Sequence, residues 1–259
     1  MRFLYVGDIV GKPGRNVVLA LVPKLRTERK LDAVVVNCEN AAGGKGVTPE
    51  LADELLRAGI DVLTSGNHIW QYRDIKSYLE HESRLIRPAN YPRAPGRGSY
   101  VLTLKDGRRL GVIQVEGRVF MRNLDCPFLT LERELAHMGK VEASLVDVHA
   151  EATSEKQAIG WHFAGKFSAV IGSHTHVQTA DDRILPGGTA YLTDVGMTGP
   201  HDSVIGMQKE AAIERFLTQR MQGHEVATGD VRLCGVIIET DDATAKATSI
   251  ERLQIAWPG

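Results

Sequence analysis

The sequence Gly172-Ser173-His174-Thr175-His176 places two histidines two residues apart, directly after the largely apolar run 167–171. Such a run predicts a buried strand. Histidines at the carboxyl end of a strand can turn both imidazoles into one cavity, and imidazole is a common ligand for iron, zinc, copper and nickel. By itself the pair is a weak signal, because two loop histidines bonded to backbone or water would give the same pattern.

Four other predicted strands also end in polar side chains. Short apolar runs at 3–6, 32–37, 60–63 and 143–148 predict these strands. The residues that follow them are Asp8, Glu39 with Asn40, Asn67 with His68, and His149. In an open α/β sheet, ligands bind beyond the carboxyl ends of the strands. A random chain would scatter such residues, so this coincidence is the main indication of a shared site.

Helical and strand patterns alternate along the first part of the chain. Helices are predicted at about 13–30, 48–57, 70–79, 127–138, 154–164 and 209–219, and antiparallel hairpins at 99–115, 183–192 and 231–255. The early alternation predicts right-handed βαβ units with parallel strands, and the antiparallel strands come last. We expect an α/β fold in which a two-sheet β-sandwich of mixed parallel and antiparallel strands is flanked by helices. Residues 1–259 are interpreted as a single domain, with parts of 70–140 as candidates for a small cap.

Composition limits the classes of protein to consider. The 31 basic and 32 acidic residues give a net charge of −1, so stable nucleic-acid binding is not expected. Three widely spaced cysteines are typical of a reduced protein rather than a disulfide framework. The N-terminus has no signal-peptide pattern, and the longest apolar helical run, 17–22, is too short to cross a bilayer. We expect a cytoplasmic protein without a membrane partner, and self-association is left open.

The polar strand ends also form a recognisable series of motifs. They are Gly7-Asp8, Asn37-Cys38-Glu39-Asn40, Gly66-Asn67-His68, Asp147-Val148-His149 and Gly172-Ser173-His174-Thr175-His176. With these motifs the chain resembles the calcineurin-like metallophosphoesterases and, more closely, the bacterial YmdB-type phosphodiesterases. The motifs extend from residue 7 to residue 176 in the order of the family, which is about two-thirds of the chain.

Three positions depart from the pattern of the wider superfamily. Its Asp-x-His is Asp8-Ile9-Val10 here, its bridging aspartate is Glu39, and Ile69 stands where an acid usually follows Gly-Asn-His. The first change removes a histidine ligand. The resemblance to the YmdB-type subgroup implies that Asn40 replaces it.

The resemblance implies a site for two metal ions. One ion would be held by Asp8, Glu39, Asn40 and His176, and the other by Glu39, Asn67, His149 and His174. Nitrogen and oxygen ligands without cysteine favour iron or manganese over a structural zinc site, and the resemblance points to iron. The predicted reaction is attack of a metal-bridging hydroxide on phosphorus, with His68 as the catalytic proton donor.

Five of the site residues also have another interpretation. Asp8 could cap the following helix, Asn40 could stabilise the Gly-rich loop, and Asn67 could be a turn residue. His149 could be bonded to solvent, and His68 could be a ligand or a bystander. Lys45 and Arg118 could contact phosphate, although solvated loop charges are the simpler interpretation. The other histidines are interpreted as surface or structural residues: His81, His137, His162, His201 and His224.

The predicted function is hydrolysis of small phosphodiesters, with 2′,3′- or 3′,5′-cyclic nucleotides favoured by the resemblance. The first alternative is a phosphomonoesterase of broad specificity. The second, from a different class, is a metal-binding regulatory protein with little turnover, which the missing histidine after Asp8 motivates.

Overall fold

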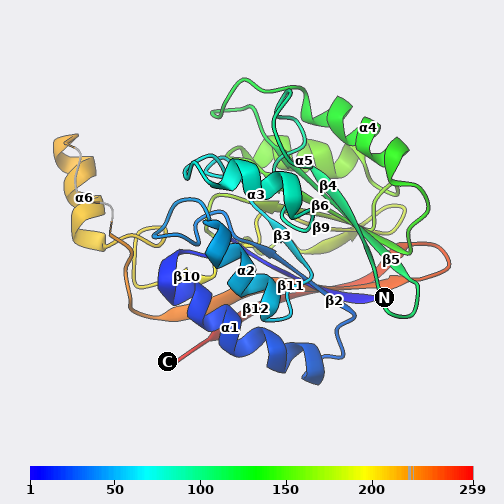
Figure 1. Cartoon of the computed structure of the whole chain (residues 1–259), viewed down its shortest axis with the longest axis horizontal. Coiled ribbons are helices and arrows are strands. Elements are labelled where there is room, and N and C mark those ends of the chain that lie inside the picture. Colours follow the sequence, from blue (N-terminus) through cyan, green and yellow to red (C-terminus); the bar gives the residue numbers. More distant parts are fainter. Residues whose placement is uncertain (221–222, 224, 259) are drawn as a thin grey trace.

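The computed structural model describes residues 1–220, 223 and 225–258. Their strands form two six-stranded sheets that pack face to face, with helices on the two outer sides (Figure 1). The prediction of a two-sheet α/β sandwich with flanking helices and mixed strand directions is therefore confirmed. His224, one of the histidines interpreted above as surface or structural residues, lies outside the described residues.

The first sheet contains both ends of the described chain. Its strand order is β10-β11-β1-β2-β3, and β12 pairs with β11. Pairs β1–β2 and β2–β3 are parallel, whereas β11 runs antiparallel to both β1 and β12. The strands span Arg2–Val6 (β1), Ala33–Asn37 (β2), Val62–Thr64 (β3), Gly199–Pro200 (β10), Val231–Asp241 (β11) and Lys246–Ala256 (β12).

The second sheet has the order β4-β5-β6-β7-β9-β8. Its four central strands, β5, β6, β7 and β9, are parallel, and β4 and β8 form antiparallel edges. The strands span Ser99–Thr103 (β4), Arg109–Glu116 (β5), Ala143–His149 (β6), Ala169–Ser173 (β7), Arg183–Leu185 (β8) and Thr189–Leu192 (β9). The expectation that parallel pairing belongs to the first part of the chain is thus too narrow, because parallel strands form the centre of this sheet too.

Helices cover both outer faces. They span Gly11–Glu28 (α1), Pro49–Arg57 (α2), Ile75–His81 (α3), Pro127–Met138 (α4), Thr153–His162 (α5) and Lys209–Thr218 (α6). Apolar residues of α1, α2 and α3 pack on the first sheet, and those of α4 and α5 pack on the second. Thr48 caps α2 by accepting a hydrogen bond from the Leu51 N–H, and Pro49 follows at the first helical position, as the sequence predicted.

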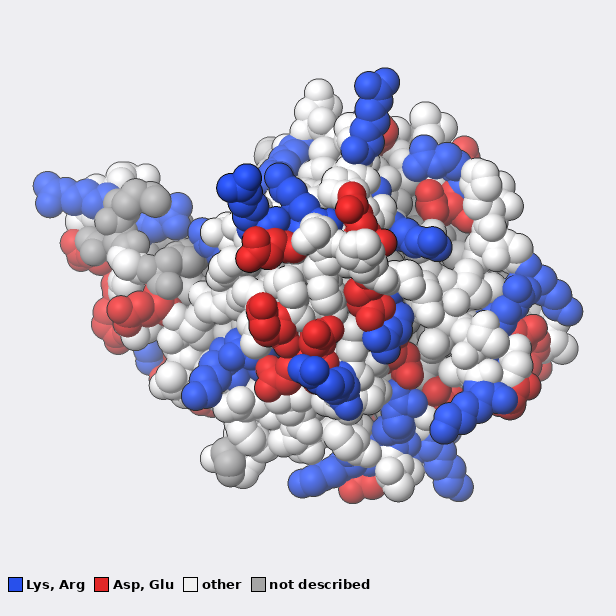
Figure 2. All heavy atoms as spheres, in the orientation of Figure 1, with Lys and Arg blue, Asp and Glu red and all other residues white. Residues whose placement is uncertain are grey.

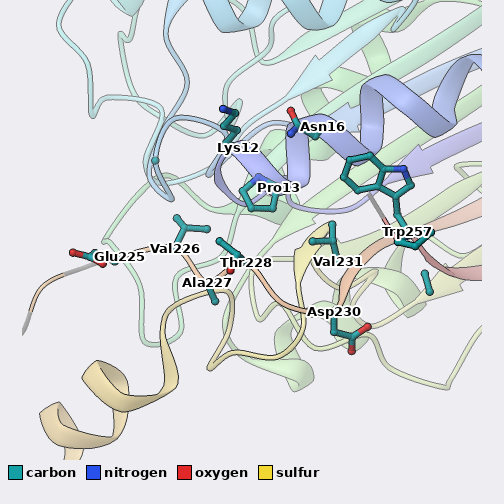
Figure 3. Close-up of a pocket in the computed structure, with 13 residues that line it drawn as sticks. Lys12, Pro13, Asn16, Glu225, Val226, Ala227, Thr228, Asp230, Val231 and Trp257 are labelled. Atoms are coloured by element: carbon teal, nitrogen blue, oxygen red, sulfur yellow. The ribbon is translucent and has the colours of Figure 1, made fainter.

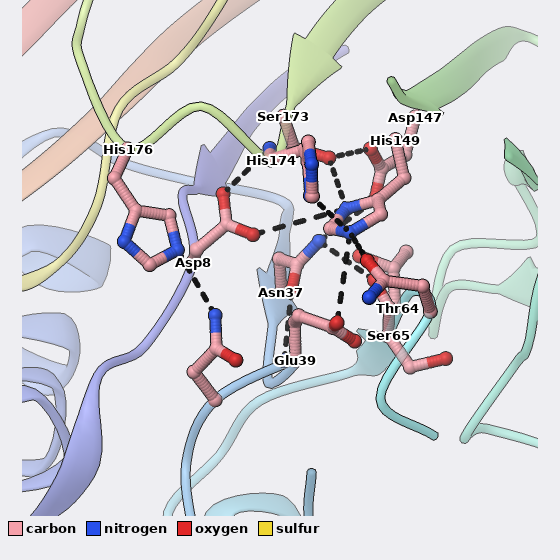
Figure 4. A network of polar contacts seen from close by, with 12 residues as sticks. Asp8, Asn37, Glu39, Thr64, Ser65, Asp147, His149, Ser173, His174 and His176 are labelled. Carbon is pink, nitrogen blue, oxygen red and sulfur yellow. Dashed lines mark hydrogen bonds and ion pairs between the residues drawn. The ribbon is translucent and has the colours of Figure 1, made fainter. Parts of the chain in front are cut away.

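The layer between the sheets is a continuous apolar core. Alternate residues of each strand point inward, so Phe3, Tyr5 and Val35 of the first sheet meet Leu145 and Ile171 of the second. The chain adopts this packing because its strands are apolar on both faces, one for the partner sheet and one for the helices. The carboxyl ends of β1, β2, β3, β6 and β7 meet at one edge of this sandwich, where the predicted site residues lie (Figure 4).

Two helix boundaries differ from the prediction. The helix expected at 70–79 begins only at Ile75, because the chain after His68 forms tight turns, with the Gln71 N–H donating to the His68 carbonyl. The first helix begins at Gly11 and continues through Pro23. The predicted cap from parts of 70–140 stays a prediction.

Helix α6 projects from the rest of the molecule (Figure 1) and contains no buried residue. Ile213, Phe216 and Leu217 are exposed on it. On the face shown in Figure 2, basic and acidic side chains are interspersed rather than gathered into one basic patch. None of the helices in the described part of the chain is long and apolar enough to cross a membrane.

Candidate metal centre

The predicted site residues converge between the two sheets. Asp8 and His149 are fully buried, Glu39 is 1% exposed and Asn40 is 3% exposed. Asp8 comes from the end of β1, Glu39 and Asn40 from the end of β2, Asn67 and His68 from the end of β3, His149 from β6, and His174 and His176 from the end of β7. Figure 4 shows Asp8, Glu39, His149 and His174 facing one another.

Contacts around His149 match the ligand set predicted for one of the two ions. The Nε2 atom of His149 lies 3.0 Å from Asn67 Oδ1, 3.2 Å from His174 Nδ1 and 3.6 Å from Glu39 Oε1. Two ligands that each lie about 2.1 Å from one ion are about 3–3.5 Å apart. The spacing of these nitrogen and oxygen atoms therefore suits a shared metal ion.

The second predicted set, which adds Asp8, Asn40 and His176 to Glu39, is less completely assembled. The Asn40 amide lies against His176, with its nitrogen 3.0 Å from His176 Nε2, and Asn40 Oδ1 lies 2.9 Å from His68 Nδ1. Amide oxygen and nitrogen have nearly the same shape, and rotating the amide by half a turn would present the oxygen beside His176. Asn40 fits a ligand role only in that rotated form.

Two buried carboxylate oxygens support a cation at this position. Asp8 Oδ1 and Glu39 Oε2 have no hydrogen-bond partner among the described residues. Within that same part of the chain, no three His, Cys, Asp or Glu side chains alone form a metal cage. The ligand sets therefore need their asparagine oxygens and some side-chain adjustment, and their roles stay predictions.

The histidine rings are held by acceptors on the side away from the site. The pair His174 Nε2 and Glu151 Oε2 is 3.1 Å apart, and His176 Nδ1 lies 2.8 Å from the Ile205 carbonyl. Metal-binding histidines usually donate their second N–H in this manner, which fixes the ring and frees the other nitrogen. His174 thus presents Nδ1 to the site, and His176 presents Nε2.

The carboxylates of the site favour positive charge beside Glu39. Burial raises the pKa of Asp8 to about 6. Burial would also raise the pKa of Glu39, but His149 and His68 lower it to about 2. Burial would lower the pKa of His149, but Glu39 and Asp8 raise it to about 9. Burial, together with the neighbouring His149, lowers the pKa of His174 to about 3. The cluster therefore stabilises a cation beside Glu39.

The backbone of the histidine loop is strained. His174 and His176 have φ values of 98° and 66°, in the region that favours glycine. The loop is held by Asp194, whose Oδ2 accepts hydrogen bonds from the N–H and the hydroxyl of Thr175. Asp194 also pairs with the buried Lys156 at 2.7 Å. Strained backbone at a site persists only where surrounding contacts determine it, and this buried pair supplies them.

Two of the structural alternatives, those for Asp8 and His149, are wrong. Asp8 does not cap α1, whose N-cap is Val10 without a side-chain cap. His149 is not bonded to solvent, because it is fully buried. Asn40 does stabilise the Gly-rich loop, but through its carbonyl, which accepts from the Gly11 and Gly44 N–H groups, while its side chain faces the site.

The site does not coincide with the cavity shown in Figure 3. That cavity, of about 820 Å³, lies where the start of α1 meets the last strands. Its lining includes Lys12, Asn16, Val226, Asp230 and Trp257 but none of the predicted site residues.

Sequence reasoning missed the side chains that support the metal-binding residues, such as Glu151 and Asp194. A general signal existed only for Asp147, which shares a strand face with His149.

Comparison with known proteins identifies the family. The model of the YmdB-like protein family matches residues 4–253. A 2′,3′-cyclic-nucleotide 2′-phosphodiesterase from Bacillus subtilis (strain 168) is 48% identical over 98% of this chain and 97% of its own. The chain therefore belongs to the YmdB-like family, as the motifs indicated.

Two crystal structures have the same fold. A hypothetical protein from Thermus thermophilus has a TM-score of 0.93 and 41% identity, with each chain fully covered. A novel phosphatase from Mycoplasma pneumoniae also has a TM-score of 0.93, with 33% identity over 99% of this chain and 93% of that one. The predicted class of enzyme, a hydrolytic phosphoesterase, is confirmed.

Proposed function

We propose that the protein is a metal-dependent phosphodiesterase that hydrolyses cyclic nucleotides. The observation that carries this proposal is the convergence of three side chains on His149 Nε2. Donor atoms of Asn67, His174 and Glu39 lie 3.0–3.6 Å from it. The 48% identity with a 2′,3′-cyclic-nucleotide 2′-phosphodiesterase supports the substrate class. A 3′,5′-cyclic nucleotide is the second candidate substrate.

Two metal ions are part of the proposal. Asp8, Glu39, Asn40 and His176 would hold one ion, and Glu39, Asn67, His149 and His174 the other. Such ions supply Lewis acidity toward a phosphoryl oxygen and lower the pKa of water. The nitrogen and oxygen donors favour iron, with manganese as an alternative and zinc less favoured.

His68 is suited to move a proton at the edge of this site. Its backbone N–H donates to Glu39 Oε1 at 2.8 Å, and its Nδ1 lies 2.9 Å from the Asn40 amide, whose nitrogen would face it in the rotated form. These contacts orient the ring, and they leave Nε2 as the nitrogen that can face a substrate. The side chain is 31% exposed, so a bound phosphodiester can reach it. We assign His68 as the proton donor to the leaving oxygen.

The proposal also covers the location of the enzyme in the cell and its self-association. The sequence composition favours the cytoplasm. The exposed apolar side chains of α6, Ile213, Phe216 and Leu217, are the surface on which self-association would rest. Light scattering of purified protein tests this second point.

An assay with three substrates tests the function. Protein reconstituted with iron or manganese is given bis-p-nitrophenyl phosphate, p-nitrophenyl phosphate and 2′,3′-cyclic AMP. The proposal expects turnover of the cyclic nucleotide and the diester well above that of the monoester. Preference for the monoester would favour a phosphomonoesterase, and two bound metals without turnover would favour a regulatory protein.

A further inference from the structure

A chain of buried hydrogen bonds ends at the Nδ1 atom of His149, which also lies 3.8 Å from Asp8 Oδ1. Ser173 Oγ lies 3.0 Å from His149 Nδ1 and donates its hydrogen to Asp147 Oδ1 at 2.6 Å. All three side chains are fully buried (Figure 4). Asp147 and His149 share one face of β6, and Ser173 stands opposite His149 on β7.

The direction of each hydrogen bond follows from the groups at the other end. Asp147 Oδ2 accepts from Gln114 Nε2 at 2.7 Å and from Asn37 Nδ2 at 3.1 Å. Both amides have a fixed orientation, because their oxygens accept backbone N–H groups, those of Ser65 and Glu39 respectively. Asp147 is therefore surrounded by donors and acts as an acceptor only.

This arrangement determines which nitrogen of His149 carries a hydrogen. Because the Ser173 hydroxyl hydrogen points to Asp147, only the lone pairs of Ser173 Oγ remain for His149. The Nδ1 atom of His149 must then be the donor. In the neutral ring, which is the form that binds a metal, the Nε2 atom then keeps its lone pair toward Glu39 and Asn67.

We propose that Asp147 is a positioning residue that acts through Ser173 to hold His149 in the form that binds a metal through Nε2. The inference rests on the proposed metal site. It predicts that the hydrogen-bond chain from Asp147 through Ser173 to His149 sets the metal affinity. Neither Asp147 nor Ser173 would contact the metal. A histidine partner of this kind typically changes metal affinity by about 10–100-fold.

The substitution Asp147→Asn provides the sharpest test, because it changes no volume. Gln114 and Asn37 still require an oxygen where Oδ2 now lies, so the new amide nitrogen takes the place of Oδ1. That nitrogen donates to Ser173 Oγ, which frees the hydroxyl hydrogen to turn toward His149 Nδ1. The ring then carries its hydrogen on Nε2 and cannot bind a metal there without rearrangement.

The experiment measures zinc affinity by competition with a chelator, with zinc used as a diamagnetic probe. Asp147→Asn and Ser173→Ala are each expected to weaken binding by about 10–100-fold. Ser144→Ala is the matched control, because Ser144 is a buried serine on the neighbouring strand β6, bonded to Ser168 rather than to the site. It should lower the melting temperature about as much as Ser173→Ala, with zinc affinity unchanged.

Nitrogen-15 NMR of the zinc-loaded wild type gives a direct readout. The inference expects the ring hydrogen of His149 on Nδ1 and zinc on Nε2; the reverse assignment would overturn it, as would wild-type zinc affinity in both variants. Turnover of bis-p-nitrophenyl phosphate by the wild type is measured separately. If the wild type shows no turnover but the variants lose zinc affinity as expected, the proposed function is refuted and the inference stands. If turnover is normal and the zinc affinities are unchanged, the inference alone is refuted.

Discussion

Glu39 Oε1 lies 3.6 Å from His149 Nε2, and both side chains are buried. The neighbouring His149 helps to lower the pKa of Glu39 to about 2, and Glu39 helps to raise that of His149 to about 9. Each group thus stabilises the opposite charge on the other, and a metal ion bound at His149 Nε2 would take the place of the proton there. A metal ion beside Glu39 would be stabilised by the same negative charge, so this carboxylate is central to the proposed site.

Replacing Glu39 with glutamine should therefore release both metals. The substitution keeps the shape but removes the charge that is proposed to serve two ions at once. Elemental analysis of purified Glu39→Gln protein measures the result. Retention of two ions per chain would refute the bridging role.

Removal of the His68 imidazole should slow the reaction without emptying the site. His68→Ala is expected to reduce kcat by about 10²-fold or more, because a positioned proton donor typically contributes that much. Metal content should stay at two. His162→Ala is the control, since this exposed histidine pairs with Glu132 on the outer helices. Loss of a metal from His68→Ala would mean that His68 is a ligand instead.

Gly66 should be required for the position of His149. A Cβ atom at Gly66 would lie 2.4 Å from His149 Nε2, closer than any real contact. Gly66→Ala should therefore displace the ring and weaken metal binding by about tenfold or more. Gly160→Ala is the matched control, because its Cβ would press on the ring of Tyr191 at 2.5 Å, and Tyr191 is not a predicted site residue. Equal metal affinity in the two variants would contradict this prediction.

The buried pair of Lys156 and Asp194 should make stability depend on pH. Burial would raise the pKa of Asp194, but Lys156 and the bond from Thr175 hold it below the ordinary 3.8. Asp194→Asn leaves Lys156 without its partner and should cost about 3–5 kcal/mol of unfolding free energy at pH 7.

The sign of the pH effect follows from that lowered pKa. The stability that Asp194 contributes is present above the unfolded carboxyl pKa and is lost as pH falls through the folded one. The difference between wild type and Asp194→Asn should therefore shrink at about pH 3, below the ordinary carboxyl pKa. Urea unfolding at the two pH values measures it. A stability difference that grew on acidification would contradict the account. In the Asp194→Asn variant, the further substitution Lys156→Met should restore part of the unfolding free energy lost at pH 7.

The sequence predicted the sandwich and the convergence of strand ends because both follow from local patterns. Apolar runs of strand length, each ended by Asp8, Glu39, Asn67, His149 or His174, indicate a site wherever parallel strands share an edge. Other features depend on contacts between distant segments. The carbonyl of Ile205 that holds His176 lies 29 residues further along the chain.

Local patterns also could not give the backbone of the histidine loop. Positive φ at His174 and His176 is unfavourable for these residues taken alone, and it persists through Asp194 and its partner Lys156. The late start of α3 at Ile75 has a similar cause, since the turns after His68 are set by the site.

Anomalous diffraction from crystals of the protein, grown with its own metal and recorded at that metal's absorption edge, tests the central claim most directly. The account predicts two peaks about 3.5–4 Å apart, with Glu39 between them, Asp8 and His176 beside one, and His149 and His174 beside the other. A single peak, or peaks away from these side chains, would contradict it.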